Sequence, residues 1–251
     1  MWAVSDRRLF TPLLLALIAL AWVALWAWGQ SPYGRFLSHH ALAEVRGGGL
    51  LVVVFVAGWI LMIVAMMLPT SLPLVALFRA LVRQRPDPTQ LVALLIAGYL
   101  SIWVLFGVAV YAGDWGLHEL VERTAWLSTN AWMVGTAMVL LAGLYQFTPL
   151  KYHCLDKCRS PLAFVMERWR GGRERARAFG IGVSHGIFCL GCCWSLMLLM
   201  FAVGVGNLGW MLALGAVMAV EKNMPWGRRM SAPLGVVLVA WGAYLLRSGL
   251  M

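Results

Sequence analysis

The chain has 251 residues, of which 62% are hydrophobic and only 12% are charged. A soluble domain is nearer to about 45–50% apolar and about 25% charged, so this composition excludes a water-soluble globular enzyme, a disordered chain and a secreted disulfide scaffold. The net charge of +10 would suggest nucleic acid in a soluble protein. Lys and Arg collect on the cytoplasmic side of membrane proteins, and no nucleic-acid partner is expected.

Seven apolar runs follow one another along the chain, and none shows the alternation of a transmembrane strand. A helix satisfies its own backbone hydrogen bonds in lipid. We therefore predict an all-α, polytopic transmembrane helix bundle of about seven helices, with residues 1–251 forming a single integral membrane domain. The predicted spans are Thr11–Gly29, Leu50–Phe78, Gln90–Ala112, Asn130–Leu150, Phe179–Val203, Asn207–Val220 and Ala232–Leu246.

The basic residues predict the orientation of the bundle. If the N-terminus is cytoplasmic, 16 of the 20 Lys and Arg residues lie on the inner side of the membrane. Only Arg35, Arg46, Arg123 and Arg247 then lie outside. This bias predicts an N-in, C-out protein of the bacterial inner membrane, with lipid as its surroundings.

The longest predicted loop, residues 151–178, is basic and cytoplasmic, and it contains one helical pattern. Ser160 and Pro161 resemble a helix start, and apolar residues then recur from Leu162 to Trp169 at helical spacing. We predict a short amphipathic helix. It would lie on the inner leaflet or cover the cytoplasmic end of the bundle, and the pattern does not separate these alternatives.

The second span contains Met66 and Met67, followed by Leu68 and Pro69, with Pro73 one turn further on. Because proline removes a backbone donor, the helix is predicted to bend or break there. Broken helices at membrane depth usually line a cavity or a binding site. Methionine also fills gaps in ordinary cores, so both interpretations stay open.

Cys154 and Cys158 follow the fourth span among Lys151, Lys157 and Arg159, and their sulfurs would lie one helical turn apart if this stretch is helical. Cationic neighbours favour the thiolate, which is the form that binds metal. The alternative is a pair of interfacial thiols without a function.

The fifth span carries the densest group of soft ligands. At 100° per residue, the side chains of His185, Cys189, Cys192, Cys193 and Met200 fall within a sector of about 100°, and Met197 lies just beyond it. Thiolates and thioethers select Cu(I), with zinc as the borderline alternative. Buried cysteines can instead act as small hydrophobic residues.

Three stretches resemble the DUF2182 family of predicted metal-binding integral membrane proteins, some of which are labelled copper chaperones. They are Ala65–Pro69, Lys151–Pro161 and Gly182–Lys222, the last including HGIFCLGCCWSLMLLMF from His185 to Phe201. The resemblance implies binding of metal, with copper expected, and carries over to Cys154, Cys158, Cys189, Cys192, Cys193 and Met66. Gly206 stands where a family Met is expected, which makes the ligand set smaller if that Met is a ligand elsewhere.

These patterns lead to the hypothesis of a membrane protein that binds Cu(I) in its core and passes it on. Cys189, Cys192 and Cys193 would be central ligands, and Cys154 and Cys158 would form the docking or exit point. Transfer ligands would be Met66, Met67, His185 and Met200. The expected partner is a copper chaperone or a copper-dependent membrane enzyme.

Two alternatives remain at the level of the sequence. The cysteine pairs could serve a membrane thiol–disulfide oxidoreductase, or the chain could be a purely structural bundle. Since it contains no Walker A loop, Rossmann fingerprint, HExxH motif or nucleophile elbow, a metal-transfer protein is expected rather than an enzyme.

Overall fold

The computed structural model describes residues 2–30, 49–169, 172–203 and 207–249. Within these ranges the secondary structure is helical and contains no strand. The predicted all-α fold is confirmed. Gly206, where the sequence departs from the expected family pattern, lies outside the described residues.

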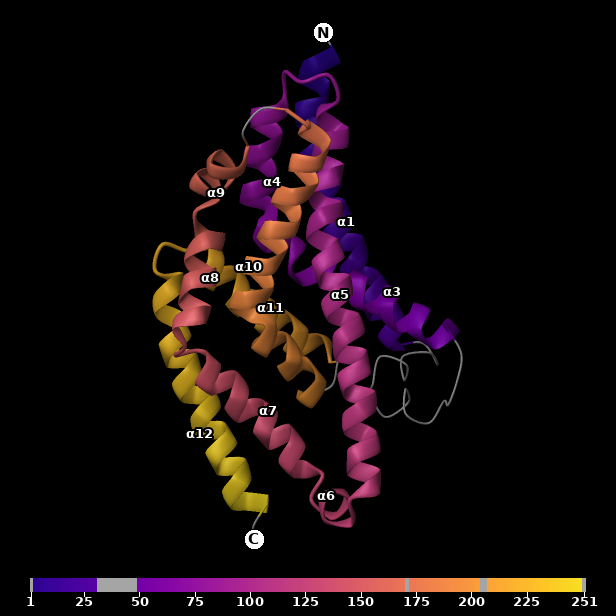
Figure 1. Ribbon diagram of the computed structural model, residues 1–251, viewed down its shortest axis with the longest axis vertical. Coiled ribbons are helices and arrows are strands. Elements are labelled where there is room, and N and C mark those ends of the chain that lie inside the picture. The colour runs from indigo at the N-terminus through magenta and orange to yellow at the C-terminus, as the bar shows by residue number, and fades with distance from the viewer. Residues whose placement is uncertain (1, 31–48, 170–171, 204–206, 250–251) are drawn as a thin grey trace.

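The predicted apolar runs correspond to helices that form one elongated bundle (Figure 1). Two of the runs are each divided into a pair of helices. In chain order the elements are α1 (Trp2–Gln30), the pair α3 (Gly49–Met66) and α4 (Leu68–Val82), α5 (Pro88–Arg123), the pair α7 (Trp132–Tyr145) and α8 (Pro149–Arg159), α10 (Glu174–Val203), α11 (Leu208–Asn223) and α12 (Ser231–Gly249). Shorter elements are α6 (Ala125–Thr129), α9 (Pro161–Arg168) and a 3₁₀ turn, η2 (Gly227–Met230).

Several of these helices are long and apolar enough to cross a membrane. Four qualify singly, namely Pro12–Gln30, Pro88–Arg123, Glu174–Met200 and Gly227–Gly249. The pairs α3–α4 and α7–α8, bent by 67° and 64°, bring the number to six if each pair is one span. Since α11 has only 16 residues, the count of seven spans remains a prediction.

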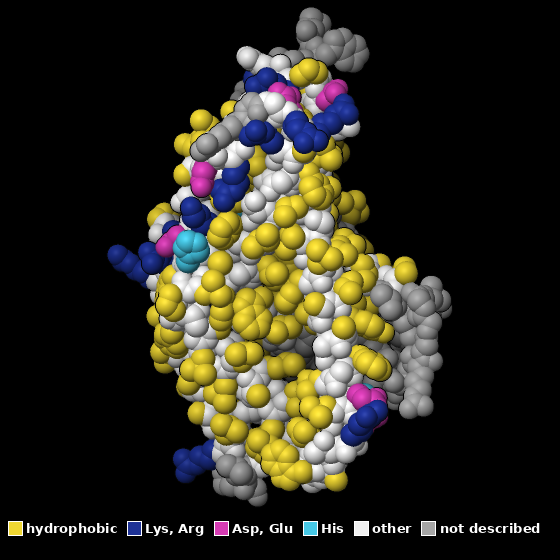
Figure 2. Space-filling model, viewed as in Figure 1, with side chains coloured by type: hydrophobic (Ala, Val, Ile, Leu, Met, Phe, Trp, Pro, Cys, Tyr) yellow, Lys and Arg dark blue, Asp and Glu magenta, His cyan; other side chains and the backbone are white. Residues whose placement is uncertain are grey.

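Charged side chains are concentrated at one end of the visible face. Figure 2 shows Lys and Arg gathered where α4 ends and α10 begins, whereas the middle of the molecule is covered by hydrophobic side chains. This separation is what the basic bias in the sequence leads us to expect. The N-in, C-out orientation itself remains a prediction.

The segment predicted as a loop, residues 151–178, contains more helix than the one short helix expected in it. Residues 151–159 belong to α8, and α10 already begins at Glu174. Pro149 occupies the first turn of α8, where its missing N–H costs nothing, and Thr148 caps the helix by accepting from the Lys151 backbone N–H at 3.3 Å. Proline therefore restarts the helix here instead of ending the span.

The predicted short helix in this region is confirmed as α9, although its buried face differs from the expected one. Phe164 and Val165 are buried, whereas Leu162 and Met166 are 59% and 58% exposed. The side chain of Ser160 makes no capping hydrogen bond. The helix α9 packs against α4 and α10. Of the two expected positions, this contact agrees with a helix that covers part of the bundle.

The centre of the bundle is the contact between α5 and α10, the most extensive between any two helices. It depends on close backbone approach at Gly98 and Gly182. A Cβ atom at Gly182 would overlap the carbonyl oxygen of Leu95, and one at Gly98 would overlap the carbonyl oxygen of Phe179. Small residues at such positions let helix backbones meet.

Replacing Gly182 with Ala is expected to lower the free energy of unfolding by about 1–3 kcal/mol, because the added methyl group meets backbone that cannot rotate away. The melting temperature, followed by tryptophan fluorescence in detergent, should fall by several degrees. Gly180→Ala on the same helix is the matched control, since nothing lies within 4 Å of its Cβ position. Equal melting temperatures for the two variants would contradict this packing argument.

Candidate metal centre

The break between α3 and α4 places Met66 and Met67 in the core, where they are 2% and 0% exposed. Because Pro69 has no N–H to donate, it leaves the carbonyl of Ala65 without its usual helical partner. That carbonyl accepts a hydrogen bond from the indole of Trp22, on α1, at 3.2 Å. The bend predicted at this proline is therefore confirmed, and a contact from another helix satisfies the freed carbonyl.

Three thiols lie together on α10 because their spacing returns them to one side of the helix. Cys189, Cys192 and Cys193 are each at most 1% exposed. The thiols of Cys192 and Cys193 donate to the carbonyl oxygen of Cys189 at 3.1 and 2.9 Å. Both also interact with the thiol of Cys189, so the structure brings the predicted trio together.

A fourth thiol comes from α8. Cys158 interacts with the thiols of both Cys189 and Cys192. Cys154, one turn earlier on α8, packs instead against Gly191, where a Cβ atom would lie 2.5 Å from its sulfur. The two cysteine groups of the sequence thus meet, and we call Cys158, Cys189, Cys192 and Cys193 the thiol cluster.

Lys222, at the end of α11, projects its amine into the thiol cluster. Its Nζ lies 3.0 Å from the sulfur of Cys189 and 3.8 Å from those of Cys193 and Met67, and it donates to the hydroxyl of Thr70 at 3.3 Å. The whole residue is only 6% exposed. The sequence pattern shows Lys222 beside Glu221 but does not predict its place at the metal centre.

Tyr99, on α5, is a second residue that sequence reasoning misses. Its hydroxyl lies 3.2 Å from the sulfur of Cys189, and its side chain is buried. The signal available in the sequence is a tyrosine within an apolar span, since the hydroxyl of a buried tyrosine usually requires a polar partner.

His185 lies beside the thiol cluster, one helical turn before Cys189. Its Nε2 is 3.2 Å from the hydroxyl of Ser71, and its ring stacks on that of Tyr99 with centroids 5.6 Å apart. The buried Nδ1 of His185 has no hydrogen-bond partner among the described residues. The structure therefore places His185 next to the cluster through Tyr99 and Ser71.

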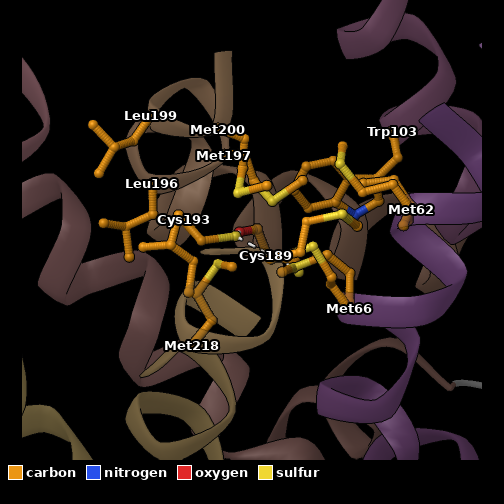
Figure 3. Packing of buried hydrophobic residues seen from close by; sticks show 14 of the residues in the cluster. Met62, Met66, Trp103, Cys189, Cys193, Leu196, Met197, Leu199, Met200 and Met218 are labelled. Carbon is orange, nitrogen blue, oxygen red and sulfur yellow. Dashed lines mark hydrogen bonds between the residues drawn. The ribbon is translucent and has the colours of Figure 1, made fainter. Parts of the chain in front are cut away.

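Methionines continue the sulfur-rich core beyond the thiol cluster (Figure 3). Met197 and Met200 follow Cys193 on α10 by one and two helical turns. They belong to one buried cluster with five further methionines, which come from α3, from α11 and from the position between α3 and α4. Each of these five residues is at most 2% exposed. These are Met62, Met66, Met67, Met211 and Met218.

Glu221, the neighbour of Lys222, faces a different helix. Its carboxylate accepts from Lys151 Nζ at 2.9 Å and from the hydroxyl of Ser231 at 2.6 Å. The carboxylate and the ammonium are 2% and 0% exposed. Adjacent helical residues point about 100° apart, so anchoring Glu221 towards α8 and α12 directs Lys222 towards α10.

The described residues contain no group of three or more His, Cys, Asp or Glu side chains arranged to hold a metal ion. The thiol cluster as it stands is therefore not arranged around an ion, and Met67 adds a thioether at its border, with its sulfur 3.8 Å from that of Cys193. The donors present are thiols and thioethers, which suit a soft ion, whereas a hard ion would need carboxylate or carbonyl oxygens. Any ion held by Cys189 and Cys193 must share the cluster with the amine of Lys222.

A pocket of about 710 Å³ lies elsewhere, among α5, α7, α11 and α12. Three tryptophans, Trp132, Trp210 and Trp241, and the imidazole of His118 form part of its wall. It contains none of the nine predicted ligands. The candidate metal centre is thus a packed core site and is separate from this pocket.

Comparison with known proteins adds one match. The family model PpoB2, described as copper chaperone, matches residues 56–245. This range contains all nine predicted ligands and Lys222, and the expected likeness to copper chaperones is confirmed, while the DUF2182 label stays a prediction. No curated protein and no solved structure matches the chain.

Proposed function

Because the chain belongs to the PpoB2 family of copper chaperones, we propose that it is a multi-pass membrane protein that binds Cu(I) at the thiol cluster and passes it to another protein. The observation that carries the proposal is the meeting of four thiols from α8 and α10 inside a methionine-rich core. Soft sulfur donors of this kind favour Cu(I) above other first-row ions.

The residues divide into two roles in this proposal. Cys158, Cys189, Cys192 and Cys193 bind the ion, and the methionines form weaker sites along which it moves. Met67 is the nearest of these, with its sulfur 3.8 Å from that of Cys193. Met66 and Met200 would extend the route through the buried core.

Cys154 and His185 stand at the edges of the cluster. Cys154 contacts α10 at Gly191, and we assign it to docking or exit of the ion together with Cys158. His185 supports the cluster through Tyr99, and as a transfer ligand it would use Nδ1, since Nε2 faces the hydroxyl of Ser71. The receiving partner in this proposal is a copper chaperone or a copper-dependent membrane enzyme.

The membrane assignment rests on the helices that are long and apolar enough to cross a bilayer. We propose the bacterial inner membrane, with the basic end of the bundle in the cytoplasm. Nothing in the fold or in the family match favours the thiol–disulfide oxidoreductase. The five cysteines, all of which lie in described residues, are free thiols.

Copper content of the detergent-purified protein tests the proposal. After loading with Cu(I) under reducing conditions and removal of loose metal, wild type should retain about one ion per chain, because the thiol cluster forms one site. The variant with all four cluster cysteines replaced by Ser should retain less than about 0.2 ion, because a hydroxyl is a poor ligand for Cu(I). Elemental analysis measures both.

Cys154→Ser is the matched control, since it removes a thiol of the same helix without entering the cluster, and it should retain most of the copper. Circular dichroism confirms that each variant is helical. Copper retained equally by wild type and the fourfold variant, or absent from wild type, would disprove the proposal.

A further inference from the structure

Lys222 carries a positive charge into the site that is proposed to bind a cation. Within the described part of the chain, the hydrogen-bond partners of its Nζ are three sulfur atoms and the hydroxyl of Thr70. The neighbouring carboxylate, Glu221, is occupied by Lys151 and Ser231. Among the described residues, the thiols around Lys222 are thus the nearest source of counter-charge for this resident cation.

A buried charge is stable only where opposite charge or hydrogen bonds compensate it. The ammonium of Lys222 meets this condition through Cys189, at 3.0 Å, and through Thr70. The ammonium 3.0 Å from the sulfur of Cys189 favours the thiolate form of that residue, which is the form that binds metal. Lys222 therefore stabilises a thiolate at the site, and it lowers the net negative charge of the thiol cluster by one unit.

We propose that Lys222 determines the charge selectivity of the thiol cluster, so that it accepts a monovalent ion such as Cu(I) and rejects divalent ions such as Zn²⁺. This inference rests on the proposed copper-binding function. An ion bound by Cys189 and Cys193 lies only a few ångströms from Nζ, because that atom is within 3.8 Å of both sulfurs.

The repulsion between Lys222 and a bound ion is proportional to the charge of the ion. A divalent ion therefore suffers twice the repulsion of a monovalent one. At about 4 Å and the effective dielectric constant of protein sites, the extra unit of charge corresponds to at least about a 100-fold loss in binding constant. By softness alone, thiolates bind Zn²⁺ as a borderline ion and do not exclude it. The positive charge of Lys222 adds the discrimination between Zn²⁺ and Cu(I).

Lys222→Met keeps the length and the apolar stem of the side chain and removes the charge, but it also adds a thioether, so Lys222→Gln, which adds no soft donor, is measured beside it. Ag(I) and Cd²⁺ serve as probes, one soft and monovalent and the other soft and divalent. Their dissociation constants are measured in the detergent-purified full chain by competition with chelators. The ratio of the Cd²⁺ constant to the Ag(I) constant should fall about 100-fold in Lys222→Met.

The ratio is informative because both probes need deprotonated thiols, so that a general change in thiol ionisation largely cancels. Lys157→Met is the matched control, an identical substitution at a lysine that is 40% exposed and screened by water. Its ratio should stay within about threefold of wild type. Lys222→Gln, which adds no soft donor, should show the same fall in the ratio, and Lys222→Arg should retain the ratio of wild type.

A change of less than about tenfold in both uncharged variants overturns the selectivity role, as does an equal change in Lys157→Met. Failure of the proposed function has a different signature. In that case wild type does not bind Ag(I) at all, whereas failure of the inference alone leaves tight Ag(I) binding and an unchanged ratio.

Discussion

Replacing Glu221 with Gln is expected to destabilise the protein strongly, far more than the loss of an exposed ion pair would. The substitution leaves the ammonium of Lys151 fully buried without a carboxylate, since the pair is 0% and 2% exposed. Removing one partner of a buried ion pair costs about 3–5 kcal/mol. At about 2–4 °C per kcal/mol for a chain of this size, the melting temperature in detergent should fall by roughly 10 °C.

Two variants test whether the ion pair is responsible. Asp156→Asn is the control, because Asp156 also pairs across helices, with Arg228 at 3.5 Å, but both side chains are about half exposed, and such pairs contribute at most about 1 kcal/mol. The double variant Lys151→Met with Glu221→Gln removes both charges and should recover much of the loss. A double variant less stable than Glu221→Gln alone would show that the pair is not the cause.

The helical fold could be predicted from the sequence because apolar runs and prolines act locally. Pro69 breaks its span whatever packs around it, and Asn207 caps α11 as its position suggests, accepting from the Trp210 backbone N–H at 3.2 Å. The error at α8 has a tertiary cause. The polar stretch from Lys151 to Arg159 resembles a solvated loop in the sequence. In the structure Lys151 is buried, because it forms an ion pair with Glu221 of another helix.

The cysteines of the site could also be predicted, whereas their grouping could not. Helical spacing identifies the trio on α10, but it does not reveal that Gly191 admits α8 so closely that Cys158 joins it. Lys222 escapes prediction because a lysine at the end of an apolar run usually extends towards water. One signal is present in the sequence, since residues i and i+1 of a helix do not face each other, so that Glu221 and Lys222 require separate partners.

Replacing Cys189 with Ser is expected to weaken Cu(I) binding more than replacement of any other cysteine. Cys189 is the centre of the cluster. It contacts the other three thiols, the amine of Lys222 and the hydroxyl of Tyr99. A serine hydroxyl fits the space but is too hard a donor for Cu(I), and a lost ligand should cost more than the roughly 10–100-fold typical of groups that only support ligands.

The dissociation constant for Cu(I), measured by competition with a chromogenic chelator under reducing conditions, should therefore rise more than about 100-fold in Cys189→Ser. Cys154→Ser makes the same exchange at a thiol that faces Gly191 outside the cluster, and its constant should rise less than about tenfold. A larger loss in Cys154→Ser than in Cys189→Ser would mean that copper is held by the α8 pair and not by the thiols of α10, and equal losses would contradict a site centred on Cys189. The order of these two constants thus separates a binding site in the core of the bundle from one at its edge, because Cys189 is inaccessible from solvent and Cys154 is not entirely so.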